Sequence, residues 1–120
     1  MEQNRRILYV QTTDAPEKQY PPLVLAQTAK AMDLDPVVYY LGTGLKVLRT
    51  GEADRMRMGG FPSVGEMLRQ TLEMGIPVYV CEASKQMLGW DTVELIDGVK
   101  IVGAATLNDL ALDCGATMWF

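Results

Sequence analysis

An α/β fold, in which a mostly parallel sheet lies between two layers of helices, is predicted by three features of this sequence. Short apolar runs alternate along the chain with amphipathic stretches of helical period. Glycine, proline or a helix-capping residue stands at most of the boundaries between them. The chain has 120 residues and shows no internal repeat or linker, so a single domain over residues 1–120 is predicted.

Five apolar runs are predicted as strands because they are short and rich in β-branched or aromatic residues. In chain order they cover residues 7–10, 37–41, 77–81, 99–102 and 117–120. The run at 77–81 is apolar throughout, which is typical of a strand buried on both faces. We therefore expect this third strand to be central in the sheet.

The first two crossovers carry the clearest helix signals. A first helix begins near Pro21, and its buried face has helical spacing: Pro22, Leu25, Ala26, Ala29 and Met32. The glycine-rich segment 42–62 is predicted to hold a short helix over 45–50. Ser63 and Glu66 have the spacing of a capping box and open a helix that Gly75 ends. The buried stripe of that helix is predicted to be Val64, Met67, Leu68 and Leu72.

The remaining elements are shorter. A short helix follows Cys81 and breaks at Gly89, and a single turn is predicted over 91–94 from a second capping-box spacing. Thr106 is predicted to cap the last helix and Gly115 to end it. The buried face of that helix is predicted to be Leu107, Leu110, Ala111 and Cys114. Because parallel crossovers are right-handed, this order predicts a flavodoxin-like three-layer sandwich with a five-stranded, mostly parallel sheet.

Composition and charge exclude several classes of function. The net charge is −4 and the pI is about 4.7, which argues against nucleic-acid binding because that needs a basic surface. The first apolar run, residues 7–10, is too short for a signal peptide or a membrane span. We therefore expect no membrane association and a cytoplasmic location, where cysteines stay reduced.

The chain contains no histidine, so the usual general base and the commonest metal ligand are both absent. Two cysteines 33 residues apart do not make a zinc site. No metal site and no cofactor are therefore expected. Thiol chemistry remains possible without an imidazole.

Cys81 is the candidate catalytic residue because it ends the third strand and directly precedes a short helix. In open parallel sheets, reactive groups gather beyond the carboxyl ends of the strands. Free backbone N–H groups at the start of a helix stabilise a thiolate and lower its pKa. Lys85 would favour ionisation, Glu82 would oppose it, and Ser84 can donate a hydrogen bond to the sulfur. The alternative is that Cys81 is only a buried strand residue.

The loops after the first two strands end at the same edge of the sheet and supply further candidates. Thr12, Thr13, Thr43, Gly44, Ser84 and Lys85 are the predicted substrate-binding residues. Residues 42–44 resemble the start of a dinucleotide fingerprint, but the third glycine is missing. The basic residues Lys46, Arg49, Arg55 and Arg57 form either a solvated face or a docking site for an acidic partner. Cys114 is interpreted as a packed, structural cysteine.

These residues together resemble the DsrE/DsrF-like (DsrEFH/TusD-type) sulfur-relay family. Most specific is the stretch from Cys81 through Met87-Leu88-Gly89 to Glu94-Leu95-Ile96-Asp97-Gly98-Val99. The segment 103–107 and residues Gly44, Leu45, Leu48 and Gly51 are similar as well. The resemblance covers nearly the whole chain and is closer to single-polypeptide members than to the heteromeric tRNA-thiolation subunits.

The resemblance implies a flavodoxin-like fold, oligomers that are often trimers or hexamers, and a cysteine that carries sulfane sulfur as a persulfide. It places Cys81 at the position of the active cysteine. It also implies rhodanese-like donors and TusA-like acceptors as partners. The leading hypothesis is therefore a cytoplasmic, homo-oligomeric sulfur carrier with sulfurtransferase-like chemistry, which requires an accessible and partly ionised thiol.

Two other functions stay open at this point. The first is a binding or assembly subunit of the same fold that has lost the sulfur chemistry, with segment 42–62 serving a partner. The second is a flavin- or nucleotide-binding module.

Overall fold

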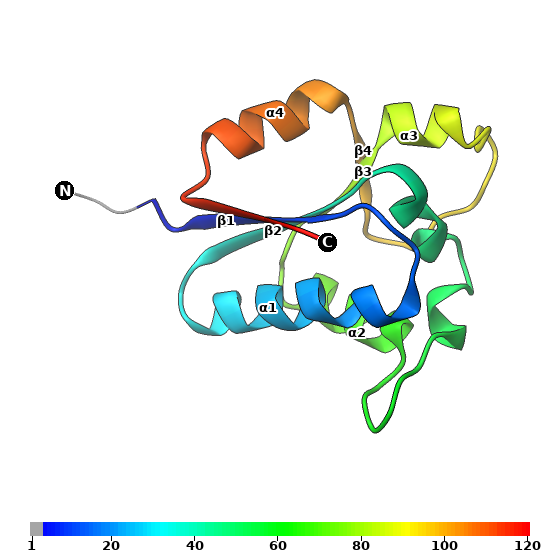
Figure 1. The fold of residues 1–120 in the computed structure, drawn as a ribbon, viewed down its shortest axis with the longest axis horizontal. Helices are drawn as coiled ribbons and strands as arrows, with labels where there is room; N and C mark the ends of the chain where they lie inside the picture. Colours follow the sequence, from blue (N-terminus) through cyan, green and yellow to red (C-terminus); the bar gives the residue numbers. More distant parts are fainter. Residues whose placement is uncertain (1–3) are drawn as a thin grey trace.

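The computed structural model describes residues 4–120 and confirms a three-layer α/β sandwich (Figure 1). All strand pairings in the five-stranded sheet are parallel, and the order is β4-β3-β2-β1-β5. The strands are β1 (Arg6–Gln11), β2 (Asp35–Tyr40), β3 (Val78–Cys81), β4 (Lys100–Val102) and β5 (Ala116–Trp119). Each lies within about two residues of its predicted range. β3 is an interior strand, although the middle of the order is β2.

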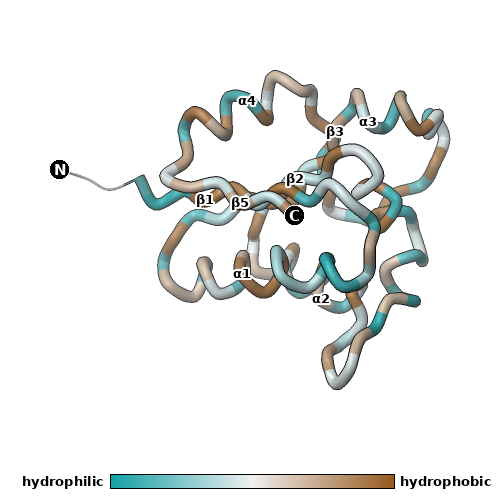
Figure 2. Tube along the Cα trace, in the orientation of Figure 1, coloured by the Kyte–Doolittle hydropathy of each residue, from teal (hydrophilic) through white to brown (hydrophobic). Residues whose placement is uncertain are grey.

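Helices cover both faces of the sheet. α1 (Tyr20–Ala31) and α2 (Val64–Glu73) lie on one face, and α3 (Glu82–Met87) and α4 (Ala104–Leu112) lie on the other (Figure 1). The alternation of side chains along each strand divides the core in the same way. Tyr9 and Tyr40 belong to the cluster under α1 and α2, whereas Tyr39 and Cys81 belong to the cluster under α4. Figure 2 shows the hydrophobic residues concentrated along the central strands.

The strand topology places the segments after β1, β2 and β3 at the same edge of the sheet. The chain runs from β1 outward to β4 and then returns to the far side of β1 with β5. Because every strand is parallel, the segments that follow β1, β2 and β3 all leave the sheet at its carboxyl edge. The predicted site residues lie in these segments.

The segment after β2 is a 3₁₀ helix, η2 (Gly42–Leu48), followed by a second short one, η3 (Ala53–Arg55). The predicted short helix at 45–50 is thus present but starts earlier. Gly44 explains the position of η2, because a Cβ atom built on it would lie only 2.6 Å from the carbonyl oxygen of Gln11. Only glycine lets this helix approach the end of β1 so closely. A further 3₁₀ turn, η1 (Pro16–Lys18), precedes α1.

The predicted cap of α2 is confirmed, since the Ser63 hydroxyl accepts a hydrogen bond from the Glu66 N–H at 3.1 Å. The predicted turn over 91–94 is wrong. The Thr50 N–H donates to the Glu94 carbonyl at 3.0 Å, and the Ile96 N–H donates to the Leu48 carbonyl at 2.9 Å. This backbone pairing satisfies groups that an isolated turn would leave to water.

The prediction that Thr106 caps the last helix is also wrong. β4 ends at Val102, and the extended Gly103 is the N-cap of α4, so Thr106 lies inside the first turn. The helix ends at Leu112, before Cys114 and Gly115. Leu107, Leu110 and Cys114 pack toward the sheet as expected, but Ala111 is exposed. Gly115 is required by packing rather than as a C′ residue, because a Cβ there would collide with the Asn4 carbonyl.

No helix within residues 4–120 is long and apolar enough to cross a lipid bilayer.

Candidate functional site

Cys81 is the last residue of β3 and the N-cap of α3. Its backbone is extended and pairs in register with Val102 of β4, after which the chain turns directly into the helix. The residue is only 2% exposed and packs in the cluster under α4. The structure therefore places Cys81 where the sequence predicted it, at the carboxyl edge of the sheet, but buries it, whereas the leading hypothesis called for an accessible thiol.

The surroundings of Cys81 favour its thiolate. Burial raises the pKa of the Cys81 thiol. The hydroxyl and N–H of Ser84, the Tyr39 hydroxyl and the Ala83 N–H together lower it by more, so that the net shift is downward. Hydrogen bonds to the charged form of a group stabilise that form. These neutral donors set the direction of the shift, and neither the predicted help from Lys85 nor the predicted opposition from Glu82 contributes.

Tyr39 is the residue of this site that sequence reasoning missed. Its hydroxyl donates to the Gly103 carbonyl at the start of α4, at 3.2 Å, and the same hydroxyl is one of the groups that lower the pKa of the Cys81 thiol. A phenol has one proton to donate, so Tyr39 can serve only one of these acceptors at a time. Burial, and then the contact with Cys81, raise the pKa of Tyr39, which keeps it protonated as a donor. Tyr39 thus links the sulfur to the first turn of α4.

Ser84 connects Cys81 to the loop after β2. The Gly42 N–H donates to the Ser84 hydroxyl oxygen at 2.7 Å, and Ser84 is 6% exposed. Since that oxygen accepts from Gly42, its own proton is free to point at the sulfur. The positive φ of Gly42, +60°, lets the chain turn sharply enough after β2 to make this contact. Ser84 therefore joins α3 to the loop after β2, and it is also one of the groups that lower the pKa of the Cys81 thiol.

The predicted threonines are used mainly to build the loops. The Thr12 hydroxyl and N–H both donate to the Phe120 carbonyl, at 2.6 and 2.8 Å. The Thr43 hydroxyl donates to the Thr12 carbonyl at 3.3 Å, which joins the first two loops. The Thr13 hydroxyl accepts from the Ala15 N–H. Lys85 is half-buried on α3. The structure brings Ser84 to Cys81, and it gives these threonine hydroxyls backbone partners instead.

Cys114 stands apart from this arrangement. It is half-buried beyond the end of α4, and burial raises the pKa of its thiol. Both cysteines are free, and the pKa shifts of their thiols are in opposite directions. That Cys81 is reactive and Cys114 structural stays a prediction.

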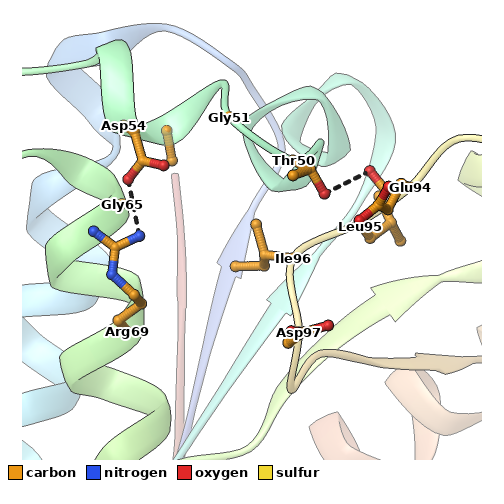
Figure 3. Close-up of a pocket in the computed structure, with 10 residues that line it drawn as sticks. Thr50, Gly51, Asp54, Gly65, Arg69, Glu94, Leu95, Ile96 and Asp97 are labelled. Carbon is orange, nitrogen blue, oxygen red and sulfur yellow. Dashed lines mark hydrogen bonds and ion pairs between the residues drawn. The ribbon is translucent and has the colours of Figure 1, made fainter.

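A pocket of about 240 Å³ lies elsewhere, between α2, the segment 50–54 and the segment 94–97 (Figure 3). On one wall Arg69 pairs with Asp54 at 2.9 Å, and on the other the Thr50 hydroxyl donates to the Glu94 carbonyl. Neither Cys81 nor any predicted substrate-binding residue lines it. The pocket is thus separate from the cysteine site.

Residues 96–99, the end of the most specific stretch of the family resemblance, have a structural role in this part of the molecule. Ile96 and Val99 pack against the core under α2. Gly98 has a φ of +95°, and a Cβ on it would approach the side chain of Leu72 to 3.2 Å. This Ile-Asp-Gly-Val sequence therefore shapes the crossover into β4 and contributes nothing directly to the site of Cys81.

Comparisons with known proteins agree with the fold and the resemblance. An uncharacterized protein of Methanocaldococcus jannaschii, MJ0760, is 34% identical over 104 residues, which cover 86% of this chain but 38% of that protein. The ychN protein of E. coli superposes with a TM-score of 0.78 at 20% identity, covering 98% of this chain and 99% of that one. A protein of unknown function from Methanobacterium thermoautotrophicum, MTH1491, has a TM-score of 0.68 at 16% identity, over 98% and 100% of the two chains.

The sequence itself matches the family described as DsrE/DsrF-like over residues 5–120, which is almost its entire length. The match includes the strand that ends at Cys81, the short helix after it and the crossover through residues 96–99. The chain therefore belongs to the DsrE/DsrF-like family.

Proposed function

We propose that this protein is a cytoplasmic sulfur carrier in which Cys81 holds sulfane sulfur as a persulfide. The observation that carries the proposal is the position of Cys81, at the carboxyl edge of the sheet and at the N-cap of α3, in surroundings that lower the pKa of its thiol. Exchange at sulfur needs a thiolate and no general base, and this chain has no histidine. Membership of the DsrE/DsrF-like family, a family of sulfur-relay type, supports the same chemistry.

The proposed step is a thiolate exchange. The Cys81 thiolate attacks the outer sulfur of a donor persulfide, R–S–SH. A new S–S bond forms to Cys81 while the S–S bond of the donor breaks, and the donor leaves as the thiolate R–S⁻. The product is Cys81–S–SH, which keeps the proton of the transferred group. Attack by an acceptor thiolate on the outer sulfur of Cys81–S–SH reverses these events, so the cycle consumes no oxidant, reductant or cofactor.

In this proposal the hydroxyls near Cys81 also stabilise the persulfide form of the residue. A persulfide ionises to an anion one sulfur atom longer than the thiolate, and the hydroxyls of Ser84 and Tyr39 are neutral, rotatable donors. In this proposal the donor and the acceptor are proteins of the rhodanese-like and TusA-like kinds. Because Cys81 is 2% exposed, exchange in this proposal proceeds from a locally opened state in which the sulfur is accessible.

One observation favours a second candidate, a binding or assembly subunit without sulfur transfer. Free cysteine is among the residue types most often buried, and Cys81 packs in the core cluster under α4. The surroundings of Cys81 lower the pKa of its thiol, however, whereas burial alone would raise it.

The test is a two-step transfer with purified proteins. A persulfidated rhodanese-like protein is the donor, a TusA-like protein is the acceptor, and sulfur is followed on each by mass spectrometry. The carrier hypothesis predicts that the acceptor is loaded only when this protein is present with Cys81 intact. Equal loading of the acceptor with the Cys81→Ser variant would favour the binding-subunit candidate.

Cys114→Ala is expected to leave transfer unchanged and to lower the free energy of unfolding by about 1 kcal/mol, because the side chain is small and only half-buried. Urea denaturation followed by circular dichroism measures the stability, and the two-step assay measures the transfer. Loss of transfer in a well-folded Cys114→Ala protein would replace the one-cysteine mechanism with a two-cysteine relay.

A further inference from the structure

The last strand of the chain lies at an edge of the sheet and is unusually exposed. β5 pairs with β1 on one side, and within residues 4–120 no strand lies on its other side. All four residues of β5 are exposed, with Met118 at 38% and Trp119 at 53%. Leu112, just before this strand, is 87% exposed. Large apolar side chains on an open sheet edge indicate a surface that another chain covers.

The backbone of β5 offers hydrogen bonds in the same place. Phe120 bonds to β1 through both its N–H, which donates to the Val10 carbonyl, and its C=O, which accepts from Thr12. Because backbone groups alternate in direction along a strand, the N–H and C=O groups of Thr117 and Trp119 point away from β1. These are the groups that a further strand would need.

The usual devices that keep a sheet edge from pairing are missing from β5. Natural edges are blocked by charged residues, prolines or bulges, and residues 114–120 contain no charged residue and no proline. The opposite edge differs, since β4 is a three-residue strand that starts with Lys100. The two edges of the same sheet are therefore protected to different degrees.

Charge indicates what covers this edge. The chain carries a net charge of −4, so two copies repel each other electrostatically in most relative orientations. The stretch 114–120 is neutral, and the nearest acidic residue, Asp113, is paired with Arg6 at 2.9 Å. Two copies can thus meet along β5 without bringing unpaired like charges together. A strand placed antiparallel to itself also matches every outward donor with an acceptor.

We propose that two copies of this chain pair through β5, antiparallel and about a twofold axis, to form one continuous sheet. With the axis beside Met118, Thr117 of one copy faces Trp119 of the second copy, and each such pair exchanges both of its N–H···O=C bonds. The Met118 side chains of the two copies then face each other across the axis, at a pair without mutual hydrogen bonds. Assemblies built through this pairing consequently contain an even number of chains.

The register gives a direct test by disulfide trapping. In a Cys81→Ser/Cys114→Ala background, Met118→Cys should form a covalent dimer on mild oxidation, because opposite residues of a non-hydrogen-bonded pair bring their Cβ atoms within disulfide range. Ile101→Cys, on the exposed edge strand β4, is the matched control and should stay monomeric on a non-reducing gel. Failure of Met118→Cys to cross-link, or equal cross-linking of both variants, would overturn the proposal.

The assembly mass gives an independent test on chains with both native cysteines. Light scattering of the wild type should show an even number of chains, and Thr117→Pro should halve that number. Proline is tolerated at an edge where the N–H faces outward, so β5 should keep its pairing with β1. Trp119→Lys provides a second variant, checked for native circular dichroism, and Ile101→Lys on β4 is the control that should keep the wild-type mass. A monomeric or odd-numbered wild type, or a folded Trp119→Lys variant of unchanged mass, would overturn the proposal.

Discussion

The pKa of the Cys81 thiol should rise in a Tyr39→Phe/Ser84→Ala double variant. Burial raises this pKa, and the hydroxyls of Tyr39 and Ser84 are two of the hydrogen-bonding groups that reverse the effect. With both removed, only the N–H groups of Ser84 and Ala83 oppose the cost of desolvating the thiolate. A tenfold fall in the acid dissociation constant of the thiol lowers the thiolate fraction at pH 7 about tenfold. The change in alkylation rate is therefore among the largest effects expected here.

The measurement is the pH dependence of alkylation by iodoacetamide, made in a Cys114→Ala background so that only Cys81 reacts. Thr28→Val is a suitable control, since it also deletes a hydroxyl but one that donates to the Val24 carbonyl on α1. It should leave the pKa of Cys81 unchanged. An unaltered pKa in the double variant would mean that these hydroxyls do not stabilise the thiolate.

Protein stability provides a second readout of the same groups. The pKa of Cys81 is lower in the folded protein than the ordinary value of 9.0, so the unfolded chain binds more protons between these two values. The stabilisation from thiolate formation is therefore complete above pH 9.0 and is lost as the pH falls through the folded-state pKa. The wild type should gain stability over this range relative to Cys81→Ser, and the double variant should gain less.

Gly44→Ala is expected to be the most destabilising single methyl addition at the site, by about 2–3 kcal/mol. The added Cβ would lie 2.6 Å from the Gln11 carbonyl oxygen and 3.4 Å from the Thr13 nitrogen, and both are backbone atoms that no rotamer change can move. Displacement of η2 would also pull Gly42 from Ser84, which are 2.7 Å apart, and so should raise the pKa of Cys81.

Guanidinium denaturation measures this effect, with the transition midpoint compared at constant slope. Gly60→Ala is the matched control, because a Cβ on Gly60 meets nothing within 4 Å, and it should be nearly neutral. Equal stabilities of the two variants would show that η2 does not depend on its close approach to β1.

The main features of the fold and the position of Cys81 could be predicted because they depend on local patterns. Alternating apolar runs gave the strands, and the end of an apolar strand placed Cys81 at the carboxyl edge. Tyr39 could not be identified in the same way. Its side chain reaches Cys81 only because β2 and β3 pair in the register that sets Tyr39 beside Tyr79, two residues before the cysteine. Neither the strand order nor the register follows from a single sequence.

The failed predictions also depend on contacts between residues that are far apart in the sequence. The turn expected over 91–94 is replaced by backbone pairing with residues 48–50, which lie more than forty residues earlier in the chain. The balance of Glu82 against Lys85 at Cys81 was judged from sequence distance, whereas hydrogen-bond donors on α3 and β2 determine the direction of the pKa shift. Likewise, a strand rich in apolar residues was predicted at the end of the chain, but only the strand order shows that it forms an open edge.

Intact-mass spectrometry after incubation with polysulfide tests the central claim most directly. The wild type and Cys114→Ala should each gain the mass of sulfur on Cys81, located by peptide mapping and removed by dithiothreitol. Cys81→Ser keeps the size and hydrogen bonding of the side chain close to native but lacks the nucleophilic sulfur, so it should fold and remain unloaded. Loading of the Cys81→Ser protein, or a wild type that no persulfide donor can load, would contradict the account of Cys81 as a sulfur carrier.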